Sequence, residues 1–148
     1  MRVVVQEAPF DPGAELNAFG KGDTDIGAVV SFTGVTRDVS GGLSRMQIEH
    51  YPGMTERALT QICEEAQSRW SLADLLVIHR HGVMEAGDNI MMVVTASRHR
   101  ADAFAAADFL MDYLKSRAPF WKKEVTVDGA DWVAAKDSDE DALDRWSQ

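Results

Sequence analysis

The sequence is poor in features that mark secreted, membrane or disulfide-stabilised proteins. Its 148 residues include one cysteine, Cys63, so no disulfide can form within the chain. That cysteine falls within a helical pattern and is expected to be a small apolar core residue. No apolar run approaches the ~20 residues that cross a bilayer, and the stretch MRVVVQEAPFDPG lacks the pattern of a signal peptide. We therefore expect a cytoplasmic protein that does not bind membranes.

Common catalytic and metal-binding motifs are also missing. The chain has no H-E-x-x-H, no P-loop and no G-x-S-x-G. His79 and His81 point to one face of an expected strand, as two metal ligands would, but no third ligand has a recognisable spacing. Core packing or a hydrogen-bonded interface role is the better interpretation of this pair. Cys63 has no evident activating partner, so neither a metal site nor a catalytic thiol is expected.

Positive charge is scarce overall, and it is concentrated in one region. The chain has 15 Lys and Arg residues and 24 Asp and Glu residues, so its net charge is −9. This negative charge argues against general nucleic-acid binding. Between Arg98 and Lys123, however, the chain has six basic and three acidic residues, whereas from Glu124 onward it has eight acidic and two basic residues. A solvated surface explains any single cation, but it explains this set less well.

The pattern of apolar residues predicts one domain, spanning residues 1–148. DPGAELNAFG indicates a short helix that is capped by Asp11, and the nearly continuous apolar run at 25–34 predicts a strand buried on both faces. Two long segments, PGMTERALTQICEEAQSRW and RHRADAFAAADFLMDYLKSRA, carry the apolar stripe of a helix. Pro119 ends the second helix, and the acidic tail from about 137 is expected to be mobile or ordered by a partner.

Alternating and β-branched runs supply the strands. They are RVVVQEA, LSRMQIEHY, ADLLVIHRHG, NIMMVVTAS, FWKKEVTV and, with a weaker pattern, DWVAA. Hairpins and helices alternate without the strict repeat of a doubly wound sheet. This order predicts an α+β fold, with a mixed, mainly antiparallel sheet and helices packed on one face.

Several cations are placed where an anion could bind. His99 and Arg100 stand where a strand gives way to a helix, whose N-terminus favours negative charge. Arg37 follows the apolar strand at the start of a glycine-bearing loop, and strand ends commonly carry functional groups. Lys115 lies in the last turn of a helix, where a lysine also stabilises the helix dipole.

The segment KSRAPFWKKE, residues 115–124, combines four cations with a proline and two aromatics. Strand alternation places Lys122 and Lys123 on opposite faces, so one of them shares a face with apolar bulk. A lysine near apolar walls and other cations loses proton affinity and becomes a usable acid or base. These cations would form an anion-binding pocket if the fold brings them together.

Five blocks of the sequence resemble the large, catalytic subunit of molybdopterin synthase. They are SFTGVTRD, IEHYPGMTERAL, IHRHG, RHRADAF and LKSRAPFWKKE, in the order found in that family, and the likeness runs from about Ile26 to Trp132. The resemblance implies a two-layer α/β hammerhead-type fold and a homodimer that binds a small ubiquitin-like sulfur carrier at each end, giving a heterotetramer. It also implies sulfur transfer, twice, from the carrier's C-terminal Gly-Gly thiocarboxylate to cyclic pyranopterin monophosphate, with no cofactor. Because the Gly41-Gly42 pair is internal, the chain resembles the subunit that receives the carrier.

The same resemblance assigns residues to the site. The family's substrate-binding positions fall on Val35, Thr36, Arg37, His99, Arg100, Lys115, Lys122, Lys123 and Glu124. Lys115 and Lys122 are implied to be catalytic: Lys115 as acid or base beside the carrier terminus, and Lys122 as the group that polarises the reacting carbon–oxygen centre. Thr36 stands where many members have valine. Lys136 stands where a basic residue, often arginine, is found, and lysine keeps the charge but loses bidentate phosphate binding.

Two other functions remain open at this point. A phosphate-ester hydrolase could use the same cations, although it would need a water-activating base or a metal, and neither is evident. A non-catalytic adaptor could use them to grip the acidic tail of a partner.

Overall fold

The computed structural model describes residues 1–38, 42–126, 129–133 and 137–147. Lys136 therefore lies outside the described residues. The elements follow one another as β1 (Arg2–Gln6), α1 (Pro12–Ala18), β2 (Ala28–Val35), β3 (Leu43–His50), α2 (Met54–Arg69), β4 (Asp74–Arg80), β5 (Gly82–Met84), β6 (Asn89–Ser97), α3 (Arg100–Ser116), β7 (Phe120–Thr126), β8 (Gly129–Trp132) and α4 (Asp137–Asp144).

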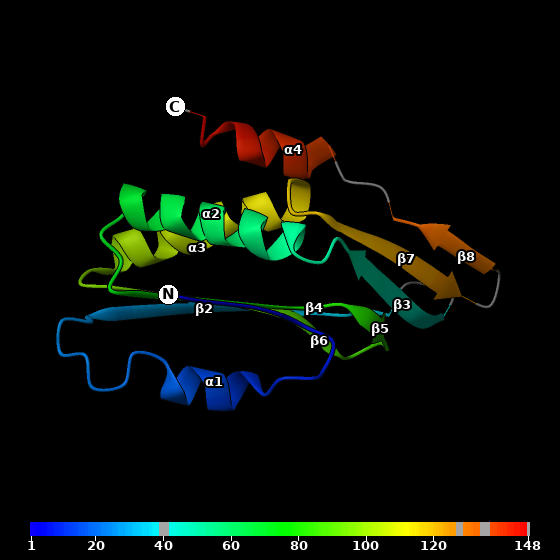
Figure 1. Cartoon of the computed structure of the whole chain (residues 1–148), viewed down its shortest axis with the longest axis horizontal. Coiled ribbons are helices and arrows are strands. Elements are labelled where there is room, and N and C mark those ends of the chain that lie inside the picture. Colours follow the sequence, from blue (N-terminus) through cyan, green and yellow to red (C-terminus); the bar gives the residue numbers. More distant parts are fainter. Residues whose placement is uncertain (39–41, 127–128, 134–136, 148) are drawn as a thin grey trace.

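The strands form two four-stranded sheets. The main sheet has the order β1-β4-β6-β2, in which β1 is parallel to β4 and the other pairs are antiparallel. The second sheet, β5-β3-β7-β8, is antiparallel throughout and extends beyond the helices (Figure 1). The predicted α+β fold with mixed, mainly antiparallel pairing is confirmed.

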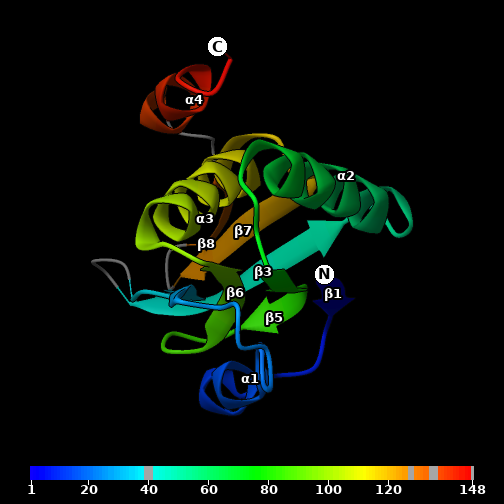
Figure 2. The same cartoon turned by 90° about the vertical axis from the view of Figure 1, so that its left-hand side faces the viewer.

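Helices cover both faces of the main sheet. α2 and α3 lie over one face and α1 lies against the other, as Figures 1 and 2 show from two sides. The expectation that helices pack on one face holds for the two long helices only. α1 begins as the sequence predicts, with the Asp11 carboxylate accepting from Ala14 N at 3.2 Å and Pro12 at the first position.

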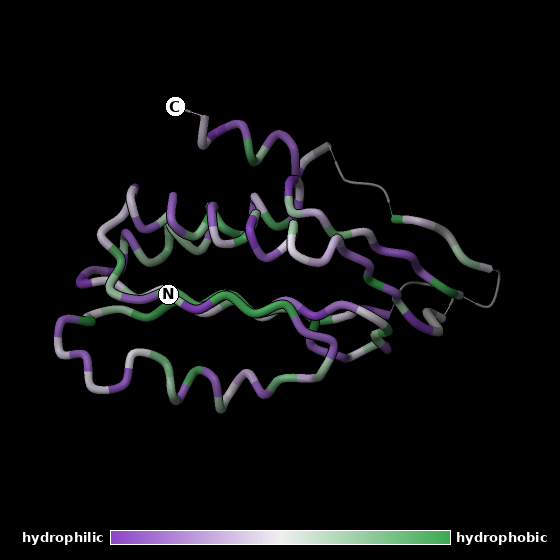
Figure 3. Tube along the Cα trace, in the orientation of Figure 1, coloured by the Kyte–Doolittle hydropathy of each residue, from purple (hydrophilic) through white to green (hydrophobic). Residues whose placement is uncertain are grey.

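The main core lies between the main sheet and the two long helices. Leu59, Cys63, Val77, Val93 and Leu110 are buried there with their neighbours, and hydrophobic colour follows the central strands in Figure 3. The prediction for Cys63 is confirmed, and burial raises the pKa of its thiol to about 12. A smaller cluster packs between the opposite sheet face and α1.

β2 departs from its prediction. Its apolar run predicts a strand buried on both faces, yet β2 is an edge strand paired only with β6 among the described strands. Val29 is 45% exposed, Phe32 42% and Val35 51%, and Phe104 on the neighbouring α3 is 60% exposed. An open edge lined by large apolar side chains is a surface on which another chain can pack.

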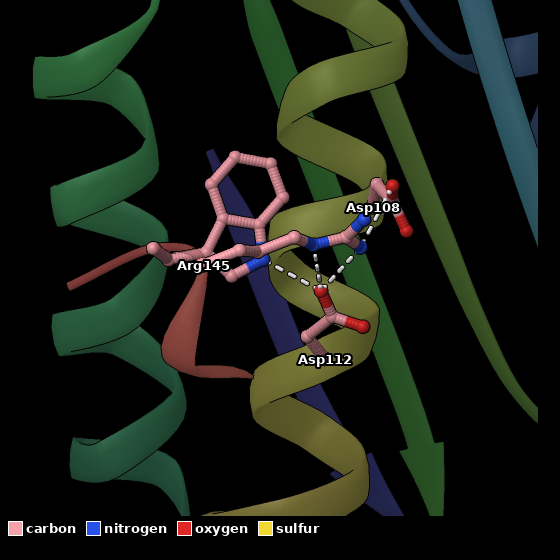
Figure 4. A network of polar contacts seen from close by, with 4 residues as sticks. Asp108, Asp112 and Arg145 are labelled. Carbon is pink, nitrogen blue, oxygen red and sulfur yellow. Dashed lines mark hydrogen bonds and ion pairs between the residues drawn. The ribbon is translucent and has the colours of Figure 1, made fainter. Parts of the chain in front are cut away.

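The acidic C-terminal segment also differs from expectation, because α4 lies against α3. Arg145 bridges Asp108 and Asp112, and the Trp146 indole donates to the same Asp112 carboxylate (Figure 4). Trp146 packs edge-on against Trp70 and Phe109, with ring centroids 5.6 and 5.5 Å away. In the described part of the chain, no helix is long and apolar enough to span a bilayer.

Candidate active site

A pocket of about 270 Å³ opens where the two sheets meet the end of α3. Its walls are largely apolar, with Phe32 and Val35 from β2, Met91 from β6 and Leu114 from α3. Three basic side chains also line it: His79, Lys115 and Lys122. A mostly apolar hollow with a few convergent polar groups has the character of a small-molecule site.

The chain reversal after α3 brings the two lysines to the same pocket. Lys115 occupies the last turn of α3, and Pro119 prevents the helix from continuing. The Phe120 N–H then donates to the Ala118 carbonyl at 2.8 Å, and β7 begins at once. Antiparallel pairing with β3 sets Lys122 opposite the buried Ile48, which fixes its place.

Burial, together with the nearby charge of Lys115, lowers the pKa of Lys122 to about 8, whereas Asp139 on α4 opposes the shift. The cause is the desolvation cost of the ammonium inside an apolar wall. The sequence predicted that one of the two neighbouring lysines would lie near apolar bulk, and the structure identifies it as Lys122. An amine that titrates close to neutral pH can supply charge or move a proton.

His79 belongs to this pocket, although no functional role was expected for it. Its side chain is 4% exposed, and its ring stacks on Phe120 with centroids 3.7 Å apart. The expectation of core packing or hydrogen bonding is met, because His79 Nδ1 lies 2.7 Å from the Arg80 carbonyl. The HRH pattern flagged this residue, but no local spacing could show that its ring would reach the pocket wall.

The end of β2 supplies three of the expected residues, with different surroundings. Val35 lines the pocket, and Thr36 directly follows it. Thr36 is 2% exposed: its N–H donates to the Asp88 carbonyl, its carbonyl accepts from Gly87 N, and its hydroxyl has no hydrogen-bond partner among the described residues. Arg37 is exposed and lies outside the pocket lining of the single chain.

His99 and Arg100 lie at the other end of the molecule. With Arg98 and Gly27 they line a separate open hollow of about 410 Å³ at the start of α3. Glycine is needed there, because a Cβ on Gly27 would lie 2.1 Å from the Arg98 carbonyl oxygen. Since α3 rises 1.5 Å per residue, Arg100 and Lys115 are about 22 Å apart along the helix. One chain therefore divides the expected cations between two hollows.

The last two expected residues lie beside the pocket. The Lys123 ammonium lies 5.6 Å from the centre of the Trp132 ring, on the strand face opposite Lys122. Glu124 shares a face with Lys122 and pairs with Met46 across the sheet, but it is outside the pocket lining. No group of three or more potential metal ligands occurs among the described residues.

Comparison with known proteins gives a consistent result over nearly the whole chain. The sequence profile of the MoaE protein family matches residues 5–117. The molybdopterin synthase catalytic subunit of Cereibacter sphaeroides is 66% identical, over 99% of this chain and 100% of that protein. The protein of the same name from Pseudomonas aeruginosa is 51% identical, with both chains covered completely.

Solved structures agree with this result. The molybdopterin biosynthesis MoaE protein from Burkholderia ambifaria superposes with a TM-score of 0.85 at 46% identity, covering 99% of this chain and 98% of that one. Molybdopterin synthase from Staphylococcus aureus superposes with a TM-score of 0.81 at 28% identity, covering 88% of this chain and 96% of that one.

Proposed function

This chain belongs to the MoaE protein family, and we propose that the pocket between Lys115 and Lys122 is its reaction centre. The protein is a sulfurtransferase of molybdenum cofactor biosynthesis, the catalytic subunit of molybdopterin synthase. It transfers sulfur from the thiocarboxylated C-terminus of a small carrier subunit to cyclic pyranopterin monophosphate. The observation that carries the site assignment is a half-buried lysine of lowered pKa beside a second lysine in one apolar pocket.

The charges suit two negatively charged reactants. The substrate carries a cyclic phosphate and the carrier ends in a thiocarboxylate, so the two repel each other in a shared pocket. Cations fixed before the reaction offset that repulsion and stabilise the charge that develops as sulfur adds and the phosphate ring opens. Lys115 acts as acid or base beside the carrier terminus, and Lys122 in its charged form polarises the reacting carbon–oxygen centre.

Two features make the lysine pocket suitable for positioning. Lys122 belongs to a paired strand, and Lys115 belongs to a helix that packs on the main sheet, so neither depends on a free loop. Catalytic groups on such elements keep their separation better than groups on loops. Val35 lines the pocket at the end of β2, and the exposed Arg37, two residues later, would contribute charge at the entrance.

We further propose that a second copy of the chain completes the site. β2 is an open edge strand, and its ends mark the two hollows: Ala28 lines the one with His99 and Arg100, and Val35 lines the lysine pocket. If β2 pairs antiparallel with its copy, Ala28 of one chain lies near Val35 of the other. His99 and Arg100 would then face the lysine pocket of the partner copy and hold the phosphate and pterin.

The apolar side chains at this edge support the same arrangement. Val29 and Phe32 on β2, together with Phe104 on α3, would be removed from water by a twofold contact. A homodimer with one carrier at each end gives a heterotetramer. A cytoplasmic setting belongs to the proposal as well, since the single buried thiol suits a reducing compartment.

The direct test mixes the purified chain with a thiocarboxylated carrier and cyclic pyranopterin monophosphate and measures molybdopterin. Formation of the dithiolene is the expected result. Carrier binding without product would favour the adaptor function. Release of phosphate from simple esters without a sulfur donor would favour a hydrolase.

A further inference from the structure

We propose that His79 is a positioning residue that accepts a hydrogen bond from Lys122 through Nε2 and so aims the lysine at the reacting atoms; this inference rests on the proposed function of the pocket. His79 lies on β4 and Lys122 on β7, and both side chains line the same hollow. Such a contact would join the main sheet to the second sheet across the pocket wall.

The tautomer of His79 follows from its backbone contact. Nδ1 lies 2.7 Å from the Arg80 carbonyl, and a carbonyl oxygen can only accept. Nδ1 must therefore carry the proton, which leaves Nε2 with a free lone pair in the neutral ring. A neutral histidine fixed in this way is a hydrogen-bond acceptor with a defined direction.

The ring plane is fixed as well as the tautomer. His79 stacks on Phe120 with ring centroids 3.7 Å apart and planes inclined by 15°. Phe120 and Lys122 are two residues apart on β7, so their side chains leave the same face of the strand. The aromatic ring that holds His79 is thus the immediate same-face neighbour of the lysine that His79 would contact.

The surroundings of His79 disfavour its protonated form. Burial lowers its pKa to about 3, and the charges of Lys122, His50 and Lys115 act in the same direction, against the Arg80 hydrogen bond. The ring therefore stays neutral at physiological pH and cannot store a proton. Around Lys122, Lys115 on α3 disfavours the ammonium and Asp139 on α4 favours it.

This arrangement would divide the three N–H donors of Lys122 between two tasks. One donor would be held by Nε2, and the others would remain for substrate. Because an acceptor stabilises the ammonium, His79 would also oppose the loss of charge that burial promotes. The residue would thereby keep Lys122 both aimed and charged, without contacting substrate itself.

The test measures the pKa of Lys122 by NMR in protein labelled with ¹³C at lysine Cε, which needs no substrate and so does not depend on turnover. The chain has five lysines, and Lys122→Arg identifies the signal. His79→Asn keeps a donor for the Arg80 carbonyl but cannot reach as far as Nε2, whereas His79→Gln places its oxygen near that position. His81→Asn is the matched control, because His81 is outside the pocket lining.

We expect His79→Asn to lower the pKa of Lys122 by about 0.5–1 and His79→Gln to restore it. In turnover, kcat should fall in the Asn variant with KM unchanged, and the alkaline limb of the pH profile should move to lower pH. An equal pKa of Lys122 in the Asn and Gln variants would overturn the proposal. A loss of activity that merely parallels the loss of stability in each variant would also overturn it. If neither variant folds, ¹⁵N shifts of wild-type His79 decide the matter, since a proton on Nε2 excludes the contact.

Discussion

The guanidinium of Arg145 lies 2.6 Å from the carboxylate of Asp112, and the same carboxylate accepts a hydrogen bond from the indole of Trp146. One acid on α3 thus holds two consecutive residues that follow α4. This pairing explains why a segment whose composition suggests a solvated tail instead lies against the helical layer.

Trp146→Ala should release α4, because the substitution removes the ring that packs on Trp70 and Phe109. We expect the free energy of unfolding to fall by about 1–3 kcal/mol. Urea denaturation measures that loss, and hydrogen exchange over residues 137–147 reports the release. Trp132→Ala is the control. Because Trp132 is largely exposed, this substitution should lower the free energy of unfolding by less. Unchanged protection of α4 would show that the indole does not hold it.

Lys115→Ala and Lys122→Ala should each lower turnover by about 10²–10⁴-fold, the range for loss of an acid–base or electrostatic group. Both lysines line the pocket without belonging to the core, so the unfolding midpoint should change little or rise. The assay is molybdopterin formation at saturating carrier, with the remote, exposed Lys21→Ala as control. Weakened carrier binding together with normal turnover at saturation would assign the lysines to docking.

Mixing two inactive variants tests whether the site is shared between copies. Arg100→Ala and Lys122→Ala each damage one of the two hollows. After random exchange of chains, each mixed dimer would contain one site with both residues intact, so activity should recover to about a quarter of wild type. If all the groups acted within one chain, the mixture would stay as inactive as its components.

Lys122→Met should stabilise the fold at neutral pH while abolishing catalysis. The pKa of Lys122 falls from 10.5 to about 8, so between these pH values the unfolded chain binds more protons and stability rises with pH. The cost of the half-buried ammonium is therefore present in full below about pH 8 and is gone by about pH 10.5. We expect a gain of about 1–2 kcal/mol at pH 7 that disappears by pH 10.5. A gain that does not vary with pH would show that packing, and not charge, is responsible.

Local chemistry made much of the fold predictable from the sequence. Asp11 with Pro12 marked the start of α1, Pro119 marked the end of α3, and the apolar stripe of the segment at 52–70 marked α2 as a helix with one buried face. β2 was misjudged, because an apolar run looks the same whether a neighbouring strand or another molecule covers it. α4 was not predicted, because its residues are mostly acidic and the contacts that Arg145 and Trp146 make with Asp112 lie beyond its last turn.

The site was predictable in its parts but not in its assembly. The segment around Pro119 indicated two lysines at a fixed separation, and the structure places both in one pocket. The separation of Arg100 from Lys115 follows from the length of α3, but which hollow each end joins depends on sheet order. His79 could not be assigned, since its neighbour Phe120 lies 41 positions later and meets it only through tertiary packing.

The open β2 strand has a consequence for the amount of protein as well as for its chemistry. Unpaired amides flanked by Val29 and Phe32 can template pairing with any extended segment, so an isolated copy is the species at risk of aggregation. Assembly protects by mass action, and that protection weakens on dilution. A substitution that weakens the contact covering the β2 edge should therefore reduce the yield of soluble protein before any defect in turnover becomes measurable.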